Sequence, residues 1–133
     1  MHQIPAAQDN LVWLIEYHPG HVAAVDGPSA KETLLYCNDN NLILDTIINT
    51  HTHGDHIGIN RDLSRRGLLK NMRVIGAKAR YKEIPGITDM VEDGDSIFLG
   101  DIRGIAMRTD GHIDGHISYL FSDLLFCGEG EVG

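Results

Sequence analysis

The sequence has few of the features that would direct a protein to a membrane or to a nucleic acid. Its 133 residues contain no run of the roughly 18 apolar residues that a membrane-spanning helix needs. The first residues, MHQIP, have neither a basic stretch nor a following apolar run, so a secretory signal is not expected. Only 11 basic residues stand against 19 acidic ones, and a net charge of -8 repels phosphate. We therefore expect a cytoplasmic protein with no membrane partner and no nucleic-acid partner.

Cysteine is also scarce. Cys37 and Cys127 are the two cysteines; they lie far apart in the sequence, form no C-x-x-C pair and have apolar neighbours. This pattern favours reduced, buried thiols over a disulfide. What remains is the composition of an ordinary globular protein, with 42% hydrophobic and 23% charged residues. The length suits a single domain, 1–133, with one continuous core.

Short apolar runs punctuated by turns predict most of the strands. The runs at 11–15 and 22–25 flank a Pro-Gly turn and predict a hairpin of buried strands. The run at 42–48 is rich in isoleucine and leucine, which favours a strand that ends directly before a histidine-rich stretch. Another strand is predicted at 74–75.

Two helices are expected between these strands. The sequence SAKE at 29–32 contains a capping box, which predicts a helix from about residue 30 to residue 40, with both of its leucines facing inward. A short helix is predicted over 60–69, capped by the asparagine at its first position. Strands that alternate with helices indicate a mixed sheet with helices on one face, in the α+β class.

The last third of the sequence changes character. Apolar runs at 97–99, 105–107, 117–121 and 124–127 are separated by Gly-Asp, Asp-Gly and Ser-Asp turns, which predicts a meander of short strands. The final residues, GEGEVG, are expected to be a frayed tail.

The stretch THTHGDH at 50–56 holds three of the eight histidines. Residues two apart in a strand point the same way, so His51 and His53 can converge on one ion. The following glycine allows a sharp turn, after which Asp55 and His56 would approach from another direction and hold a second ion. These imidazole and carboxylate groups suit zinc, and also iron or manganese. The alternative is a solvated polar turn, in which the aspartate only caps a helix.

A second histidine-rich stretch, TDGHIDGH, lies at 109–116 between two predicted strands. A tetrahedral site that already has two histidines lacks a third ligand from a strand end, and His112 is our choice. His116 is expected to orient a ligand or to close the turn. For His2, His18 and His21, near turns or the terminus, a surface role is expected.

Three stretches together resemble a known family. They are THTHGDHIG, TDGHIDGHISY and LFCG, from residue 50, residue 109 and residue 125. The first is similar to the H-x-H-x-D-H signature of the metallo-β-lactamase-fold hydrolases. Its combination with the other two is similar to glyoxalase II, the hydroxyacylglutathione hydrolases. The resemblance implies the N-terminal part of an αββα sandwich, in a domain that is incomplete at its C-terminus.

The resemblance also implies a site with two zinc ions. Its ligands would be His51, His53 and His112 for the first ion, Asp55 and His56 for the second, and Glu129 at the position of the family's bridging aspartate. A hydroxide held between the ions would attack the thioester carbonyl of an S-acylglutathione, with Asp55 as a catalytic residue that steers it. The products would be a hydroxy acid and glutathione.

The sequence departs from the family pattern in ways that leave other functions open. Glu129 is one methylene longer than the family's aspartate, and the family's second half-sandwich and glutathione-binding helices do not follow. If the chain supplies only one sheet and its helices, the inner face of that sheet is exposed and self-association is expected. The alternatives are a glutathione persulfide dioxygenase with a single iron and a non-catalytic metal-binding fragment. A β-lactamase role is less favoured.

Overall fold

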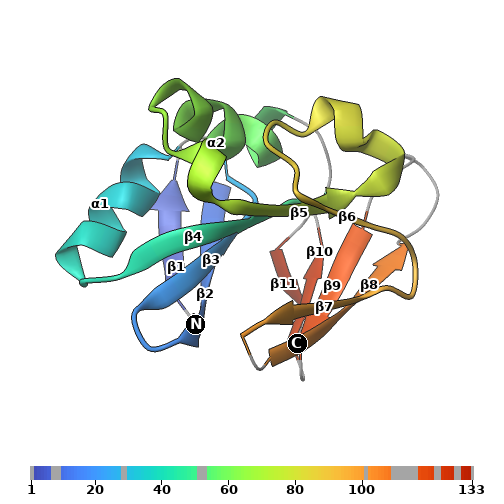
Figure 1. Ribbon diagram of the computed structural model, residues 1–133. Coiled ribbons are helices and arrows are strands. Elements are labelled where there is room, and N and C mark those ends of the chain that lie inside the picture. Colours follow the sequence, from blue (N-terminus) through green and yellow to red (C-terminus); the bar gives the residue numbers. More distant parts are fainter. Residues whose placement is uncertain are drawn as a thin grey trace.

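The computed structural model describes most of the chain as helices, strands and short turns. The described residues are 2–6, 10–27, 30–50, 54–100, 102–108, 117–121, 124–127 and 130–132. Within them, two helices and two β-sheets form three layers (Figure 1).

The first sheet is mixed, as the sequence predicts. Its strands, in spatial order, are β1 (His2–Ala6), β2 (Asn10–His18), β3 (His21–Val25), β4 (Ile43–Ile48), β5 (Arg73–Ala77) and β6 (Asp89–Val91). The pairs β1–β2 and β2–β3 are antiparallel, whereas β3, β4, β5 and β6 run parallel to one another. Because the ends of parallel strands meet at one edge, the loop after β4 leaves the sheet beside the end of β3.

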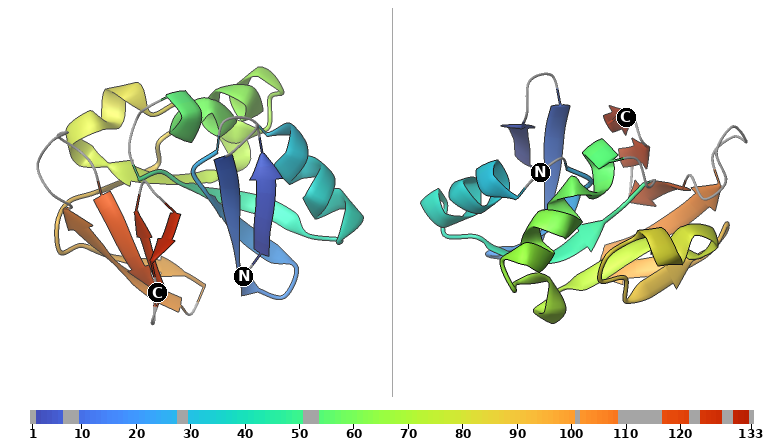
Figure 2. Two further views of the ribbon diagram at one scale, coloured as in Figure 1. Left: turned by 180° about the vertical axis from the view of Figure 1, so that it is seen from behind. Right: turned by 90° about the horizontal axis from the view of Figure 1, so that it is seen from above.

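Helices cover one face of this sheet. They are α1 (Lys31–Asp39) and α2 (Gly54–Arg65), with the short 3-10 helices η1 (Leu69–Asn71) and η2 (Lys78–Glu83). Figure 1 shows α1 and α2 on the same side of β4, and the second view of Figure 2 shows them from above. Buried side chains from α1, α2 and the sheet form one hydrophobic cluster, which includes Cys37, Ile47, Ile59 and Leu63.

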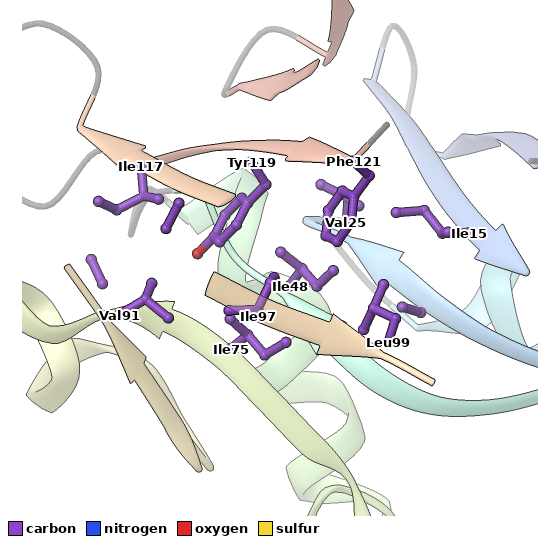
Figure 3. Close-up of a cluster of buried hydrophobic side chains, with 13 residues drawn as sticks. Ile15, Val25, Ile48, Ile75, Val91, Ile97, Leu99, Ile117, Tyr119 and Phe121 are labelled. Carbon is purple, nitrogen blue, oxygen red and sulfur yellow. The ribbon is translucent and has the colours of Figure 1, made fainter. Parts of the chain in front are cut away.

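A second sheet covers the opposite face. Its order is β11 (Gly130–Val132), β10 (Leu124–Cys127), β9 (Ile117–Phe121), β8 (Ile102–Arg108) and β7 (Ser96–Leu99), all antiparallel. The two sheets enclose a second hydrophobic cluster, drawn in Figure 3. It joins Ile48 and Ile75 of the first sheet to Leu99, Tyr119 and Phe121 of the second.

The central strands of the first sheet, β4 and β5, therefore bury side chains on both faces. In β4, Ile47 belongs to the cluster under the helices and Ile48 to the cluster between the sheets. Val74 and Ile75 divide in the same way in β5. Successive side chains of a strand point to opposite faces, so a strand between two apolar layers needs an unbroken apolar run. This explains the adjacent apolar pairs Ile47–Ile48 and Val74–Ile75.

The second sheet corrects two expectations. The chain does not supply a single sheet with a bare inner face, because the strands of the predicted meander pack on that face and bury it. The reason given for self-association is therefore wrong, although self-association itself stays a prediction. The final residues were expected to fray, but Gly130–Val132 pairs with β10 and lengthens the sheet by one strand.

The helices also differ in detail from the expectation. Helix α1 begins at Lys31, and the backbone N–H of Ala30 before it donates to the Asp62 carboxylate of α2 at 2.7 Å. Ser29 of the predicted capping box lies outside the described residues. Leu35 does not face inward, because its side chain is 55% exposed. Thr33 and Cys37 take the buried positions of α1.

Helix α2 starts earlier than predicted. It runs from Gly54 to Arg65, so Asn60 lies inside it and does not cap it. The thiol of Cys37 is free and buried, as expected, and burial raises its pKa to about 11. Cys127 is described by its backbone alone. No helix in the described part of the chain is long and apolar enough to cross a membrane.

Candidate metal centre

The histidine-rich motif connects β4 to α2. The strand ends at Ile48, and the helix begins at Gly54, six residues later. Among the predicted ligands, His51 and His53 lie outside the described residues, as do His112, His116 and Glu129. Asp55 and His56 are described by their backbone alone, which forms the first turn of α2. The structure therefore shows the residues that lead into and out of the motif.

Thr50, the first residue of the motif, is held by a buried carboxylate. Its backbone N–H donates to one carboxylate oxygen of Asp26 at 2.8 Å, and its hydroxyl donates to the other at 2.5 Å. Asp26 is 7% exposed and follows β3 directly. Its φ of 57° is in the left-handed region, which aspartate tolerates better than most residues. The end of β3 thus anchors the end of its parallel neighbour.

Asn49, one residue earlier, is bonded in three directions. Its N–H donates to the Ile75 carbonyl of β5 at 2.9 Å, which extends the parallel ladder beyond β4. Its side-chain amide exchanges two hydrogen bonds with the amide of Asn60 on α2, at 3.0 and 2.8 Å. Its carbonyl accepts a bond of 2.9 Å from the Tyr119 hydroxyl of β9. Both asparagines are at most 1% exposed. Such buried polar groups stabilise a fold only when they are paired, and these are.

Tyr119 brings the second sheet to the motif. Its ring is fully buried among Ile48, Ile97 and Ile117 in the cluster between the sheets (Figure 3). Burial, followed by the charge of Asp26, raises the pKa of its phenol, which keeps the hydroxyl protonated as a donor. A hydrogen bond to a carbonyl oxygen needs that proton.

The two histidine-rich stretches meet through their flanking residues. The N–H of Ile117, which directly follows the stretch at 109–116, donates to the carbonyl of Thr50 at 2.8 Å. Two residues far apart in the sequence are thus joined by a backbone hydrogen bond. This contact places the residue that follows TDGHIDGH beside Thr50, the first residue of THTHGDH.

The helical side of the motif is tied to the loop after β3. The N–H of Ile59 donates to the Gly27 carbonyl at 2.8 Å. Asp62, one turn further along α2, accepts from Ala30 and forms ion pairs with Arg65 and Arg66, each at 3.2 Å. The hydrogen bond from Ala30, and then the two arginines, lower the pKa of Asp62 despite its burial. The helix that carries the second half of the motif is therefore fixed against the strand ends.

Sequence reasoning missed the residues that hold the motif in place. They are Asp26, Asn49, Asn60 and Tyr119. One signal could have found two of them, because Asp26 and Asn49 are polar residues directly after apolar strands. Nothing in the sequence indicated that Asn60 or Tyr119 would reach them.

The donor set of the motif fits a divalent metal. Imidazole and carboxylate groups are the ligands that zinc, iron and manganese share. Among the side chains that the structure describes, no three His, Cys, Asp or Glu residues gather as a metal site. Those side chains do not include the six predicted ligands, so His51, His53, Asp55, His56, His112 and Glu129 stay a prediction.

A second polar cluster lies near the other end of β4. The Tyr17 hydroxyl is 2.6 and 2.7 Å from the two carboxylate oxygens of Asp45, and Nδ1 of His21 is 2.9 Å from one of them. The His18 ring lies 5.5 Å from the His21 ring. The side chains of His21 and Asp45 are 37% and 30% exposed. Burial, and then the neighbouring Asp45, raise the pKa of Tyr17 to about 12. These histidines keep the surface role that the sequence predicts.

Curated relatives resemble nearly the whole of this chain. No protein-family model matches. Hydroxyacylglutathione hydrolase 2 of Vibrio vulnificus is 42% identical over 126 residues, or 95% of this chain and 48% of the relative. The hydroxyacylglutathione hydrolase of Photobacterium profundum is 39% identical over the same shares. The chain thus spans about half the length of the curated relatives it matches.

Solved structures agree on the fold. The crystal structure of the B3 metallo-β-lactamase BLEG-1 matches with a TM-score of 0.75 at 18% identity, over 90% of this chain and 66% of that one. The structure of ETHE1 from Myxococcus xanthus matches with a TM-score of 0.70 at 22% identity, over 96% of this chain and 56% of that one. At this level of identity the likeness concerns the fold. The chain therefore has the metallo-β-lactamase fold, as its sequence motifs predict, and its curated relatives are hydroxyacylglutathione hydrolases.

Proposed function

We propose that this chain carries the metal-binding part of a hydrolase that cleaves the thioester of an S-acylglutathione. The observation that supports this best is the hydrogen bond between Ile117 and Thr50, because it joins the two stretches that hold the predicted ligands. The names of the curated relatives support the substrate class.

In this proposal, six residues bind two divalent ions. They would be His51, His53 and His112 for the first ion and Asp55 and His56 for the second, with Glu129 as a further ligand. A bound divalent metal supplies a water that ionises near neutral pH and a Lewis acid for a carbonyl oxygen. Zinc is our choice, with iron and manganese as alternatives that the same donors accept.

The chain's own contribution is to hold the ligand-bearing segments in place. The Asp26 carboxylate fixes Thr50 at the start of the motif, and Asn60 fixes Asn49 before it. Asp55, in the first turn of α2, is proposed to accept a hydrogen bond from the attacking water and so orient it. Ligands that are oriented by neighbouring hydrogen bonds bind a metal more tightly than free side chains do.

Hydrolysis of S-lactoylglutathione tests the proposal. Protein reconstituted with zinc should turn over this thioester, and His53→Ala should lower kcat/KM by roughly 100-fold or more, as expected for the loss of a metal ligand. His18→Ala is the matched control, because His18 is an exposed histidine outside the motif and should leave the rate unchanged.

Metal analysis of the same samples completes the test. About two zinc ions per chain in the parent and a clear loss in His53→Ala would support the proposed ligands. Equal rates in the parent and in His53→Ala would contradict hydrolysis by this chain. Bound iron with oxygen uptake would favour the dioxygenase alternative, and metal without turnover would favour the non-catalytic one.

A further inference from the structure

The amides of Asn49 and Asn60 form a closed pair across the base of the motif. Each side chain donates to the other, at 3.0 and 2.8 Å, and Asn60 also donates to the Pro85 carbonyl at 3.2 Å. The exposed fractions are 1% for Asn49 and 0% for Asn60. The two residues are 11 positions apart, and residues 51–56 of the motif lie between them.

The pair joins the two elements from which the predicted ligands come. Asn49 directly follows β4, and His51 and His53 come after it along the chain. Asn60 lies in α2, four residues after His56, which is about one turn of the helix. The pair therefore bridges the strand that precedes the first ligands and the helix that begins with the others.

Apolar residues would fill the same space without fixing the same geometry. Two reciprocal hydrogen bonds have directions and lengths, so they define how far α2 lies from the end of β4. Each broken bond removes a partner from a buried amide that water does not reach, which makes a shifted arrangement costly. Asn49 is also bonded to Ile75 of the first sheet and to Tyr119 of the second. Helix α2 has other ties of its own, from Ile59 to Gly27 and from Asp62 to Ala30, so loss of the pair would displace mainly the first turns of α2.

We propose that the Asn49–Asn60 pair is a positioning clamp that sets the spacing between the strand-borne ligands, His51 and His53, and the helix-borne ligands, Asp55 and His56. This rests on the proposed function, since it assumes that both pairs bind metal. Loosening the clamp moves α2 relative to the strand end. The ion that depends on α2 is then lost first, and the ion held by the strand-borne histidines is retained.

Three variants separate this role from a contribution to folding alone. Asn60→Leu removes both hydrogen bonds that Asn60 exchanges with the buried Asn49 amide. Asn49→Leu combined with Asn60→Leu replaces both amides by apolar groups of similar size, which restores much of the stability lost in the single variant. Asn71→Leu, at an exposed asparagine of η1, is the matched control.

The readout is the binding of cobalt(II) to metal-free protein, followed by visible absorption and equilibrium dialysis. In the parent and in Asn71→Leu, two ions should bind per chain. In the double variant, the first ion should bind within about threefold of the parent affinity, and the second should bind at least roughly tenfold more weakly. Thermal unfolding of the same samples shows that the variant remains folded.

Each other result overturns the clamp. Two ions bound with parent affinity in the double variant would show that the spacing does not depend on the pair. Equal weakening of both ions would show a general structural role only. A parent that binds no cobalt would overturn the proposed function together with the clamp, so the two failures are distinguishable. If the double variant does not unfold cooperatively, Asn60→Gln, which displaces the amide by one methylene, replaces it with the same outcomes.

Discussion

The two ends of strand β4 carry similar hydrogen-bonding groups in different surroundings. At one end, Asp45 bonds to Tyr17 and His21, and water reaches about a third of the side chains of Asp45 and His21. At the other, Asn49 and Thr50 bond to neighbours that are almost fully buried. Water competes for the first set and not for the second. The backbone position is therefore fixed more firmly at the end of β4 that leads into the predicted metal-binding motif.

The difference shows that exposed and buried hydrogen bonds contribute differently to stability and to the fixed positions of residues. A partly exposed hydrogen bond can be exchanged for one to water, so its loss costs little and moves little. A buried one cannot be exchanged, so its partners stay where the fold puts them or the fold loses stability. The contrast between the ends of β4 can be tested by breaking each in turn.

Asp26→Ala should have the largest effect on stability. It removes the acceptors of the Thr50 N–H and hydroxyl, and it places alanine at a φ of 57°. We expect a loss of about 3–4 kcal/mol in the free energy of unfolding, measured with urea. Asp26→Asn keeps one acceptor and a residue that tolerates this φ, and should lose about half as much. Equal losses below about 1 kcal/mol would show that the buried end is not specially anchored.

Removal of one hydroxyl at each end gives a direct comparison. Tyr119→Phe leaves the Asn49 carbonyl without the hydroxyl of β9 and should cost about 1–2 kcal/mol. Tyr17→Phe removes the bond to Asp45 at the more exposed end and should cost less than about 0.5 kcal/mol. Both changes delete the same atom from the same residue type, so each is the control for the other. A larger loss in Tyr17→Phe would reverse the comparison.

Alkaline titration tests the more exposed end of β4 through the Tyr17 phenol. The pKa of Tyr17 is raised to about 12 from an ordinary value of 10, so folding favours the protonated phenol. Its contribution is fully present below pH 10 and is lost as the pH rises to about 12. The free energy of unfolding should therefore decline less steeply over this interval in Tyr17→Phe than in the parent. Identical slopes in the two proteins would contradict the raised pKa.

The sequence predicted the elements better than their ends. The hairpin of β2 and β3, strand β4 and the meander after residue 96 follow from apolar runs and turns, which are local signals. The start of α2 was misplaced because Asn60 looks like a cap, although it is buried inside the helix and bonds to Asn49. The tail was misjudged because a strand of Gly-Glu-Val gains its stability from pairing with β10, which no local pattern shows.

In the candidate site, too, local patterns predicted some residues and not others. Most of its predicted ligands lie in short stretches with a recognisable spacing. The residues that hold the motif come from the end of β3, from α2 and from β9, and only the folded chain brings them together. Long-range contacts of this kind leave no trace in a local window of sequence. The strands of the second sheet were predicted as a meander, but local patterns did not predict that this sheet packs on the first.

The hydrogen bonds of Asn49 also differ in how soon they can form. Its partner on α2 is 11 residues away, whereas its partner on β9 is 70 residues away. Contacts close in sequence cost less loop entropy and form faster than distant ones. We expect the turn from β4 into α2 to be organised early in folding and the docking of β9 to come late. During synthesis from the N-terminus, the contact between Asn49 and α2 can therefore form before the strand that carries Tyr119 has been made.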